Sequence, residues 1–177
     1  YGDPDVLSIK EVEKPTPKHD EILVKVRATS LNRADLMQRR GLYPDPFPGV
    51  YEIPGLEFSG TVELCGDSVT TWKAGDEVMG IVSGGAYAEY LVVPEMQAIA
   101  VPQNIGLANA AAIPEVFITA WDALVCQANL QAGQWALVHA GASGVGTAAI
   151  QICKAIGAYV VVTCSAGKRD ACLALGA

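Results

Sequence analysis

The sequence of 177 residues has no uninterrupted apolar run of about 18 residues, the length that a membrane-spanning helix needs. It therefore predicts no transmembrane segment. Lysine and arginine are scarce, 12 against 19 aspartates and glutamates, and they cluster only as the pairs Arg39-Arg40 and Lys168-Arg169. A protein that binds the nucleic-acid backbone needs a larger basic patch. We therefore expect no nucleic-acid partner.

Cysteine motifs are missing as well. The five cysteines stand far apart without a C-x-x-C motif, which fits neither a disulfide framework nor a zinc knuckle. They are Cys65, Cys126, Cys153, Cys164 and Cys172. We interpret them as reduced thiols and expect a cytoplasmic protein. No secretory signal is visible, but the sequence begins at Tyr1 rather than methionine, which leaves open whether its true start is present.

Charge and proline are distributed unevenly along the chain. Residues 1–102 carry the whole net charge of −7 and nine of the ten prolines, whereas residues 103–177 are neutral and apolar and contain only Pro114. This change predicts a domain boundary, which we place between residues 108 and 109. The length suffices for one domain with a good core and part of another.

Short alternating segments between Pro, Gly and Asp turns predict a small β-rich domain in residues 1–108. The expected strands are 21–29, 58–64, 77–82 and 86–93. Ser30 is expected to cap a short helix that ends near Gly41. The following loop contains Tyr43, Pro44, Pro46, Phe47 and Pro48. Such an aromatic loop either lines a binding site or packs on the core of its own domain.

The most informative stretch is WALVHAGASGVG, residues 135–146, which is typical of a buried strand, a glycine turn and a helix. A helix start offers free N–H groups and a positive dipole end to a phosphate, and glycines let the ligand approach the backbone. The dinucleotide fingerprint G-x-G-x-x-G falls on Gly141, Ser143 and Gly146, with serine in place of the middle glycine. We expect Gly144 and Val145 to complete this phosphate-binding turn.

Two alternatives exist for the same turn. It resembles the hydrolase motif G-x-S-x-G, but its fifth residue is Val145, and only His139 and His19 supply an imidazole, so we set this reading aside. The glycines also suit a turn that serves only tight strand–helix packing.

Further elements complete the pattern. A helix is expected from Pro114 towards Cys126, a second buried strand over 159–163 and another helix over 168–175. The helix after the glycine turn is expected to bury Cys153 as a small apolar residue and to stop at Gly157. Alternating strands and helices predict a parallel sheet in residues 109–177.

Several motifs now agree in order and spacing: NRADLMQRRGLY (32–43), GLEFSG (55–60), AAIPEVFITAW (111–121) and HAGASGVGTAAIQ (139–151). On these, the chain resembles the medium-chain dehydrogenase/reductase superfamily, with its quinone oxidoreductase branch the nearest. The resemblance implies a GroES-like β-rich N-terminal domain followed by the first part of a Rossmann-type parallel α/β domain. It implies hydride transfer from a nicotinamide cofactor to a quinone.

The resemblance points to the zinc-free branch. Zinc enzymes of the superfamily carry a G-H-E motif with a ligand histidine, and this chain has Leu56 between Gly55 and Glu57. Leucine cannot bind a metal, and the four-cysteine zinc lobe is missing too. We therefore expect no metal, and we expect Glu57 to have a structural role and to form hydrogen bonds within its own loop.

The expected cofactor is NADPH. NAD enzymes of this design place a carboxylate about 20 residues after the fingerprint to bind the ribose 2′-hydroxyl. Here the position 24 residues after Gly141 is Ser165, and Lys168 and Arg169 follow, which favours a 2′-phosphate. The alternative is that Lys168 and Arg169 are only exposed charges at a helix start.

By resemblance, Asn32 and Tyr43 face the nicotinamide or substrate cleft, and Thr119 lies near the nicotinamide ring. We expect them to position the reactants, because a reduced quinone takes its proton from solvent or a tyrosine hydroxyl. Each has a structural alternative: a helix-start hydrogen bond for Asn32, a loop anchor for Tyr43 and helix packing for Thr119.

The chain ends soon after its second predicted parallel strand, so we expect a truncated dinucleotide fold without its second half. Full-length family members are expected to form homodimers. Two other functions stay open: a non-catalytic NADPH-binding or interaction module, and a reductase of enones or enoyl thioesters. A small-molecule quinone or enone is the expected partner.

Overall fold

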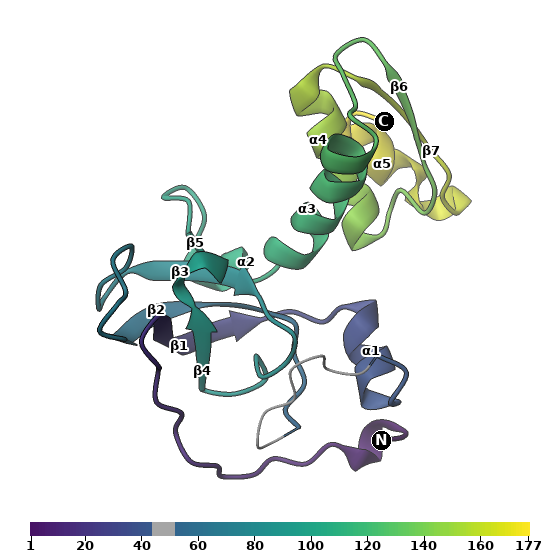
Figure 1. The fold of residues 1–177 in the computed structure, drawn as a ribbon. Helices are drawn as coiled ribbons and strands as arrows, with labels where there is room; N and C mark the ends of the chain where they lie inside the picture. The colour runs from purple at the N-terminus through teal and green to yellow at the C-terminus, as the bar shows by residue number, and fades with distance from the viewer. Residues whose placement is uncertain (44–51) are drawn as a thin grey trace. The chain divides into compact units, whose positions relative to one another are not determined.

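The structure is a computed structural model that describes residues 1–43 and 52–177 (Figure 1). The chain divides into two compact units, Tyr1–Glu115 and Val116–Ala177. The domain boundary between residues 108 and 109 stays a prediction. No helix in the described part of the chain combines the length and apolar character of a membrane span.

The first unit contains a five-stranded antiparallel sheet with strand order β4-β1-β2-β3-β5. Its strands are β1 (Glu21–Thr29), β2 (Glu57–Cys65), β3 (Glu77–Ile81), β4 (Tyr90–Pro94) and β5 (Ala98–Ala100). Helix α1 (Arg33–Arg39) follows β1 and helix α2 (Leu107–Ala110) follows β5, with single 3-10 turns at Pro4–Val6 and Glu95–Gln97. The structure confirms the predicted β-rich character of this region.

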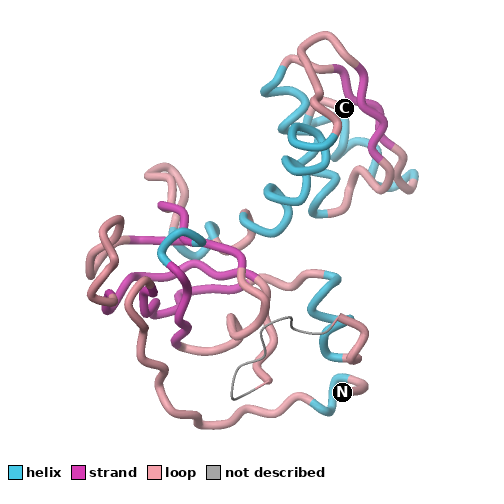
Figure 2. Tube along the Cα trace, in the orientation of Figure 1, coloured by secondary structure: helices cyan, strands magenta, loops and turns pink. Residues whose placement is uncertain are grey.

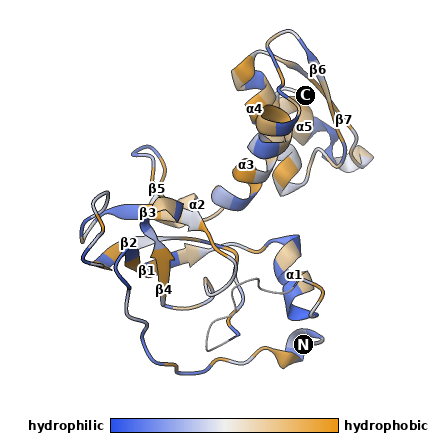
Figure 3. Cartoon of the chain, viewed as in Figure 1, coloured by the Kyte–Doolittle hydropathy of each residue, from blue (hydrophilic) through white to orange (hydrophobic). Residues whose placement is uncertain are grey.

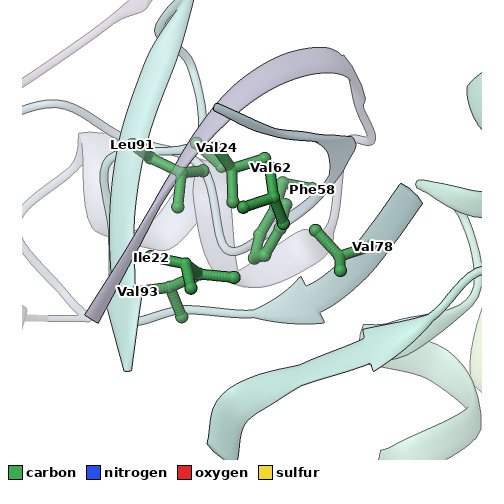
Figure 4. Close-up of a cluster of buried hydrophobic side chains, with 8 residues drawn as sticks. Ile22, Val24, Phe58, Val62, Val78, Leu91 and Val93 are labelled. Atoms are coloured by element: carbon green, nitrogen blue, oxygen red, sulfur yellow. The ribbon is translucent and has the colours of Figure 1, made fainter. Parts of the chain in front are cut away.

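One face of this sheet carries the core of the first unit. The side chains that meet there are all buried (Figure 4): Ile22, Val24, Phe58, Val62, Val78, Leu91 and Val93. Val24 lies opposite Val62 on β2, and Ile22 lies opposite Val93 on β4. Paired residues on neighbouring strands point to the same face, so this register brings the apolar side chains together. The apolar colour of β4 in Figure 3 marks its contribution.

Two predictions for the first unit are wrong in detail. The predicted strand 86–93 begins only at Tyr90, because the N–H groups of Ala86 and Tyr87 donate to the carbonyls of Gly55 and Pro54 (3.2 and 2.9 Å) instead of to a neighbouring strand. The residue that precedes α1 is Asn32 and not Ser30, whose hydroxyl donates to Glu57.

The predicted aromatic loop lies only partly within the described residues. Tyr43 is described and 44% exposed. Pro44, Pro46, Phe47 and Pro48 lie outside the described residues.

The second unit contains two parallel strands and their helices, and helix is its main component in Figure 2. Its elements are β6 (Trp135–Val138), α4 (Gly144–Ile156), β7 (Tyr159–Val162), a 3-10 turn (Ala166–Lys168) and α5 (Arg169–Leu175). Helix α3 (Pro114–Trp121) starts in the first unit and continues as a π-helical segment over Asp122–Gln127. The predicted parallel sheet is confirmed.

Helix α4 packs its apolar side on the sheet. Ser143 is its N-cap. Gly157 ends it in the left-handed conformation at φ 85°, as the sequence predicts. Ile150 and Cys153 are completely buried, and they pack with the buried Val160 of β7 and Cys172 of α5. The predicted burial of Cys153 is confirmed.

The predicted burial of both parallel strands is wrong for one face of the sheet. Trp135 and Leu137 of β6 are 70% and 63% exposed, and Tyr159 of β7 is 56% exposed. The rings of Trp135 and Tyr159 stack at 4.7 Å. The opposite face, which carries Val160, packs on α4 and α5. Within the described part of this unit, helices cover only that second face, which explains the exposure.

Candidate functional site

The glycine turn ends in a helix start that leaves two backbone donors free of helical bonds. The Thr147 N–H donates to the Ser143 carbonyl at 2.8 Å, and the Gly146 N–H donates to the Ser143 hydroxyl oxygen at 3.1 Å. The N–H groups of Gly144 and Val145 precede this first helical bond and are therefore orphan donors. The Ser143 hydroxyl accepts one bond and keeps its own hydrogen for a ligand. This arrangement suits an anion.

The three glycines of the turn are also required by the packing of the protein itself. A Cβ atom at Gly141 would lie 2.5 Å from the Cβ of Val162, and one at Gly146 would lie 2.5 Å from the Ala140 carbonyl oxygen. A Cβ at Gly144 would meet Val116 at 2.8 Å. Tight packing thus explains why these positions are glycines, and this explanation is compatible with phosphate binding at the same turn.

His139 and Thr163 form a pair beside the turn. His139 directly follows β6 and Thr163 directly follows β7. His139 Nδ1 and Thr163 Oγ1 are 3.0 Å apart, and both residues are exposed. Parallel strands end at the same edge of a sheet, and ligands of open α/β sheets bind at that edge.

Ser165, Lys168 and Arg169 form the turn that follows β7, and all three are exposed. Ser165 precedes the 3-10 turn, and its carbonyl accepts the Lys168 N–H at 2.9 Å. Arg169, the first residue of α5, and Thr163 line one open hollow of about 540 Å³. No carboxylate lines this hollow among the described residues. An anion at this end of the unit would meet positive charge.

In the first unit, Asn32 belongs to a polar network around Glu57. The Asn32 side-chain amide donates to Glu57 Oε1 at 2.7 Å, and the Glu115 N–H donates to Glu57 Oε2 at 2.8 Å. The Ser30 hydroxyl donates to the same carboxylate. Glu57 is 1% exposed. It hydrogen-bonds within the protein, as the sequence predicts, but its partners come from two other segments, residues 30–32 and the start of α3, rather than from its own loop.

Two further carboxyls belong to this network. Burial raises the pKa of Asp35, whose Oδ2 accepts the Asn32 N–H at 2.6 Å. Burial also raises the pKa of Glu115, and the negative charges of Glu57 and Asp35 add to this shift. Tyr87 donates to the Ser30 carbonyl at 3.3 Å, and burial raises its pKa too. Proton uptake by these carboxyls is therefore easier than in water.

The structure places Asn32 and Tyr43 at opposite ends of α1. Thr119 lies on α3 in the second unit and is exposed. The candidate cofactor residues Gly141, Ser143, Gly144, Val145, Gly146, Ser165, Lys168 and Arg169 all belong to the second unit and follow its two strands. The predicted cofactor residues thus share one edge of one sheet.

Sequence reasoning missed several members of these groups. Asp35 stands three residues after Asn32, and this capping-box spacing was a usable signal. Glu115 and Tyr87 reach the network only through the fold, so nothing in their sequence context marked them. His139 was considered only as a hydrolase base, and Thr163 carried no motif.

The second unit fits a dinucleotide. It offers orphan N–H groups and a serine hydroxyl at the start of a 13-residue helix, and a cationic turn after the next strand. In residues 1–43 and 52–177, no three His, Cys, Asp or Glu side chains are grouped so as to bind a metal ion. Leu56, which replaces the ligand histidine of the zinc enzymes, is 3% exposed.

Comparisons with known proteins agree with this geometry. The model of the alcohol dehydrogenase GroES-like domain matches residues 18–103. The synaptic vesicle membrane protein VAT-1 homolog of Homo sapiens is 39% identical over 166 residues, which cover 93% of this chain and 42% of that protein. The quinone oxidoreductase from Coxiella burnetii has a TM-score of 0.87 at 34% identity, with 100% of this chain and 58% of that chain covered. The chain belongs to the medium-chain dehydrogenase/reductase superfamily.

Another superfamily member, the CurK enoyl reductase, has a TM-score of 0.91 at 31% identity and covers 99% of this chain and 55% of its own. The chain thus spans about half the length of the superfamily members that it matches. The predicted GroES-like domain and partial Rossmann-type domain are confirmed. As a superfamily member, the chain is related to oxidoreductases.

Proposed function

We propose that this chain supplies the cofactor-binding turn and the substrate-side residues of a zinc-independent, NADPH-dependent quinone oxidoreductase. The observation that carries the proposal is the edge of the β6–β7 sheet, where the start of α4 faces the same end as Ser165, Lys168 and Arg169. A helix start attracts a phosphate, and two cations without a carboxylate at position 165 favour a 2′-phosphate over a 2′-hydroxyl.

In the proposed reaction, a quinone gains a hydride and a proton to give the hydroquinone. NADPH, when bound, supplies the hydride from C4 of its nicotinamide. The chain's own residues bind and orient. Ser143 and the N–H groups of Gly144 and Val145 hold the pyrophosphate, with Gly141 and Gly146 shaping the turn. Ser165, Lys168 and Arg169 hold the 2′-phosphate.

Three further residues act on the substrate side of this proposal. Asn32, Tyr43 and Thr119 position the nicotinamide or the quinone, and the proton comes from solvent or a tyrosine hydroxyl. Glu57 holds the Asn32 amide in one orientation through the 2.7 Å hydrogen bond. This fixed amide is the strongest structural support for a positioning role of Asn32.

A second candidate is reduction of an enone or enoyl thioester, which uses the same hydride chemistry on a carbon–carbon double bond. Its support is the likeness to the CurK enoyl reductase. A third candidate is a non-catalytic NADPH-binding module, in which the second unit, which contains all the candidate cofactor residues, binds the dinucleotide without hydride transfer.

One assay set separates these functions. NADPH oxidation is followed at fixed protein concentration with an ortho-quinone or a straight-chain enone, beside NADPH fluorescence and thermal-shift titrations. Saturable binding with quinone turnover supports our proposal. Faster turnover of the enone supports the enoyl-type reductase, and binding without turnover of either supports the module. Absence of NADPH binding contradicts all three.

We also propose a cellular compartment and an oligomeric state. All five cysteines are free thiols, which fits a reducing compartment such as the cytoplasm. The family resemblance further favours a homodimer for full-length family members, which sedimentation of a full-length member would test.

A further inference from the structure

The His139–Thr163 pair is built into the same hydrogen-bonded turn as the glycine motif. The Thr163 N–H donates to the Val138 carbonyl at 3.0 Å, and the Gly141 N–H donates to the Thr163 carbonyl at 2.9 Å. These backbone bonds tie the end of β7 to the end of β6 on both sides of His139. The 3.0 Å contact between His139 Nδ1 and Thr163 Oγ1 is therefore held by the sheet itself.

This contact determines which ring nitrogen is presented outward. When Nδ1 accepts the Thr163 hydroxyl hydrogen, the neutral imidazole carries its own hydrogen on Nε2. Nε2 lies on the other side of the ring, away from Thr163, and the His139 side chain is exposed. In this tautomer the pair offers one N–H donor at the edge of the sheet where both strands end.

The residues near this pair favour an anionic oxygen as the partner of the donor. His139 stands two residues before Gly141 of the glycine turn. Thr163 stands two residues before Ser165 and lines the same hollow as Arg169. The pair therefore joins the strand end that precedes the glycine turn to the strand end that precedes Ser165, Lys168 and Arg169.

We infer that His139 is a further cofactor contact, in which Nε2–H donates to a phosphate oxygen of the bound dinucleotide while Thr163 orients the ring. This inference rests on the proposed function, because it requires that the second unit binds NADPH. It assigns a role to a histidine that neither the glycine fingerprint nor the 2′-phosphate residues include.

The chain offers a favourable spectroscopic test, because it contains only two histidines. The other one, His19, lies in the first unit beside Asp67 and serves as the internal reference. In the ¹⁵N-histidine-labelled chain, titration with NADPH should shift the Nε2 resonance of His139 saturably and leave that of His19 in place. This readout needs neither turnover nor a variant.

Variants test the energetic contribution. Because a hydrogen bond to a charged oxygen is stronger than one between neutral groups, His139→Gln should weaken NADPH binding about tenfold, and His19→Gln should not. Thr163→Val removes the orienting hydroxyl and should weaken binding, whereas Thr163→Ser retains the hydroxyl and should restore it. Titration with NADH shows which phosphate His139 contacts. If His139→Gln loses affinity for NADPH alone, the contact is with the 2′-phosphate, and if it loses affinity equally for both nucleotides, the contact is with the pyrophosphate.

The inference is overturned if saturating NADPH leaves the His139 resonance unmoved, or if His139→Gln binds NADPH and NADH with wild-type dissociation constants. Failure of the proposed function looks different, because the wild-type chain would then bind neither nucleotide. That result would remove this inference together with its premise.

Discussion

The side-chain amide of Asn32 donates to the Glu57 carboxylate at 2.7 Å, so the first residue before α1 is fixed by a residue of β2. The same carboxylate accepts the Glu115 N–H at the start of α3. One buried side chain thus joins two helix starts that are far apart in the sequence. Because both α1 and α3 flank candidate substrate-side residues, Glu57 determines how firmly these helix starts are held.

Glu57→Ala should lower the free energy of unfolding of the first unit by about 2–4 kcal/mol, because it leaves buried donors of Asn32 and Glu115 without an acceptor. Urea unfolding followed by circular dichroism measures the change. Glu63→Ala, which removes the exposed carboxylate paired with Lys14, is the matched control and should change stability little. Equal stability of the two variants would show that the Glu57 network contributes nothing.

Asp35→Asn should stabilise the protein at neutral pH. Burial raises the pKa of Asp35 in the folded state, so ionising this carboxyl disfavours folding. This destabilisation is absent at low pH, where Asp35 is protonated in both the folded and the unfolded chain. It grows as the pH rises from about 3.9, the pKa of the unfolded chain, towards the higher pKa of the folded state, and it persists at higher pH. Asparagine keeps an oxygen for the Asn32 N–H.

The check for Asp35 is a series of urea unfolding curves from acid to neutral pH. The gain of Asp35→Asn over wild type should disappear towards acid pH. Asp5→Asn in the exposed N-terminal 3-10 turn controls for the loss of one charge. A gain that is the same at every pH would contradict the assignment.

The sequence was sufficient for those features whose causes are local. Strand β1 coincides with the predicted 21–29, because apolar residues and flanking turn residues mark it. Gly157 marks the end of α4 by its capping chemistry, as the sequence predicts. The glycine turn was found in the same way, since its spacing is a local property.

Features that depend on distant partners were not predictable. Ser30 has the chemistry of a helix cap, but its hydroxyl donates to Glu57, 27 residues away, and Asn32 caps α1 instead. The apolar character of Leu137 indicated burial, but burial requires a covering element, and the described helices of its unit cover the other face. The acidic network and the His139–Thr163 pair likewise arise only from tertiary contacts.

Two variants of Ser143 distinguish its role as a helix cap from its proposed role in phosphate binding. Ser143→Ala should cost about 0.5–2 kcal/mol of stability, because the Gly146 N–H loses its acceptor. Ser143→Asp should retain the cap and the stability, but its negative charge at the turn should abolish NADPH binding. Thermal unfolding and NADPH titration of both variants measure the two effects. Tight NADPH binding by the aspartate variant would exclude this turn as the phosphate site.

Gly141→Ala should destabilise the second unit by about 1–3 kcal/mol, because the new Cβ would lie 2.5 Å from the Val162 Cβ. Val162→Ala in the same chain keeps the Val162 Cβ but removes its two Cγ atoms, which would lie 2.8 and 2.9 Å from the new Cβ. It should therefore recover only part of this loss, which a double-mutant cycle in urea would reveal. Gly167→Ala is the matched control, since no atom lies within 4 Å of a Cβ built there. Equal effects at Gly141 and Gly167 would contradict the packing account.

The most direct test of the central claim is a pair of fluorescence titrations of the chain with NADPH and NADH, repeated with Ser165→Asp. The account predicts that the wild-type chain binds NADPH at least about tenfold more tightly than NADH, because Lys168 and Arg169 attract the 2′-phosphate. It predicts that the added carboxylate weakens NADPH binding selectively. Equal affinity of the wild-type chain for the two nucleotides, or an unchanged preference in the variant, would contradict it.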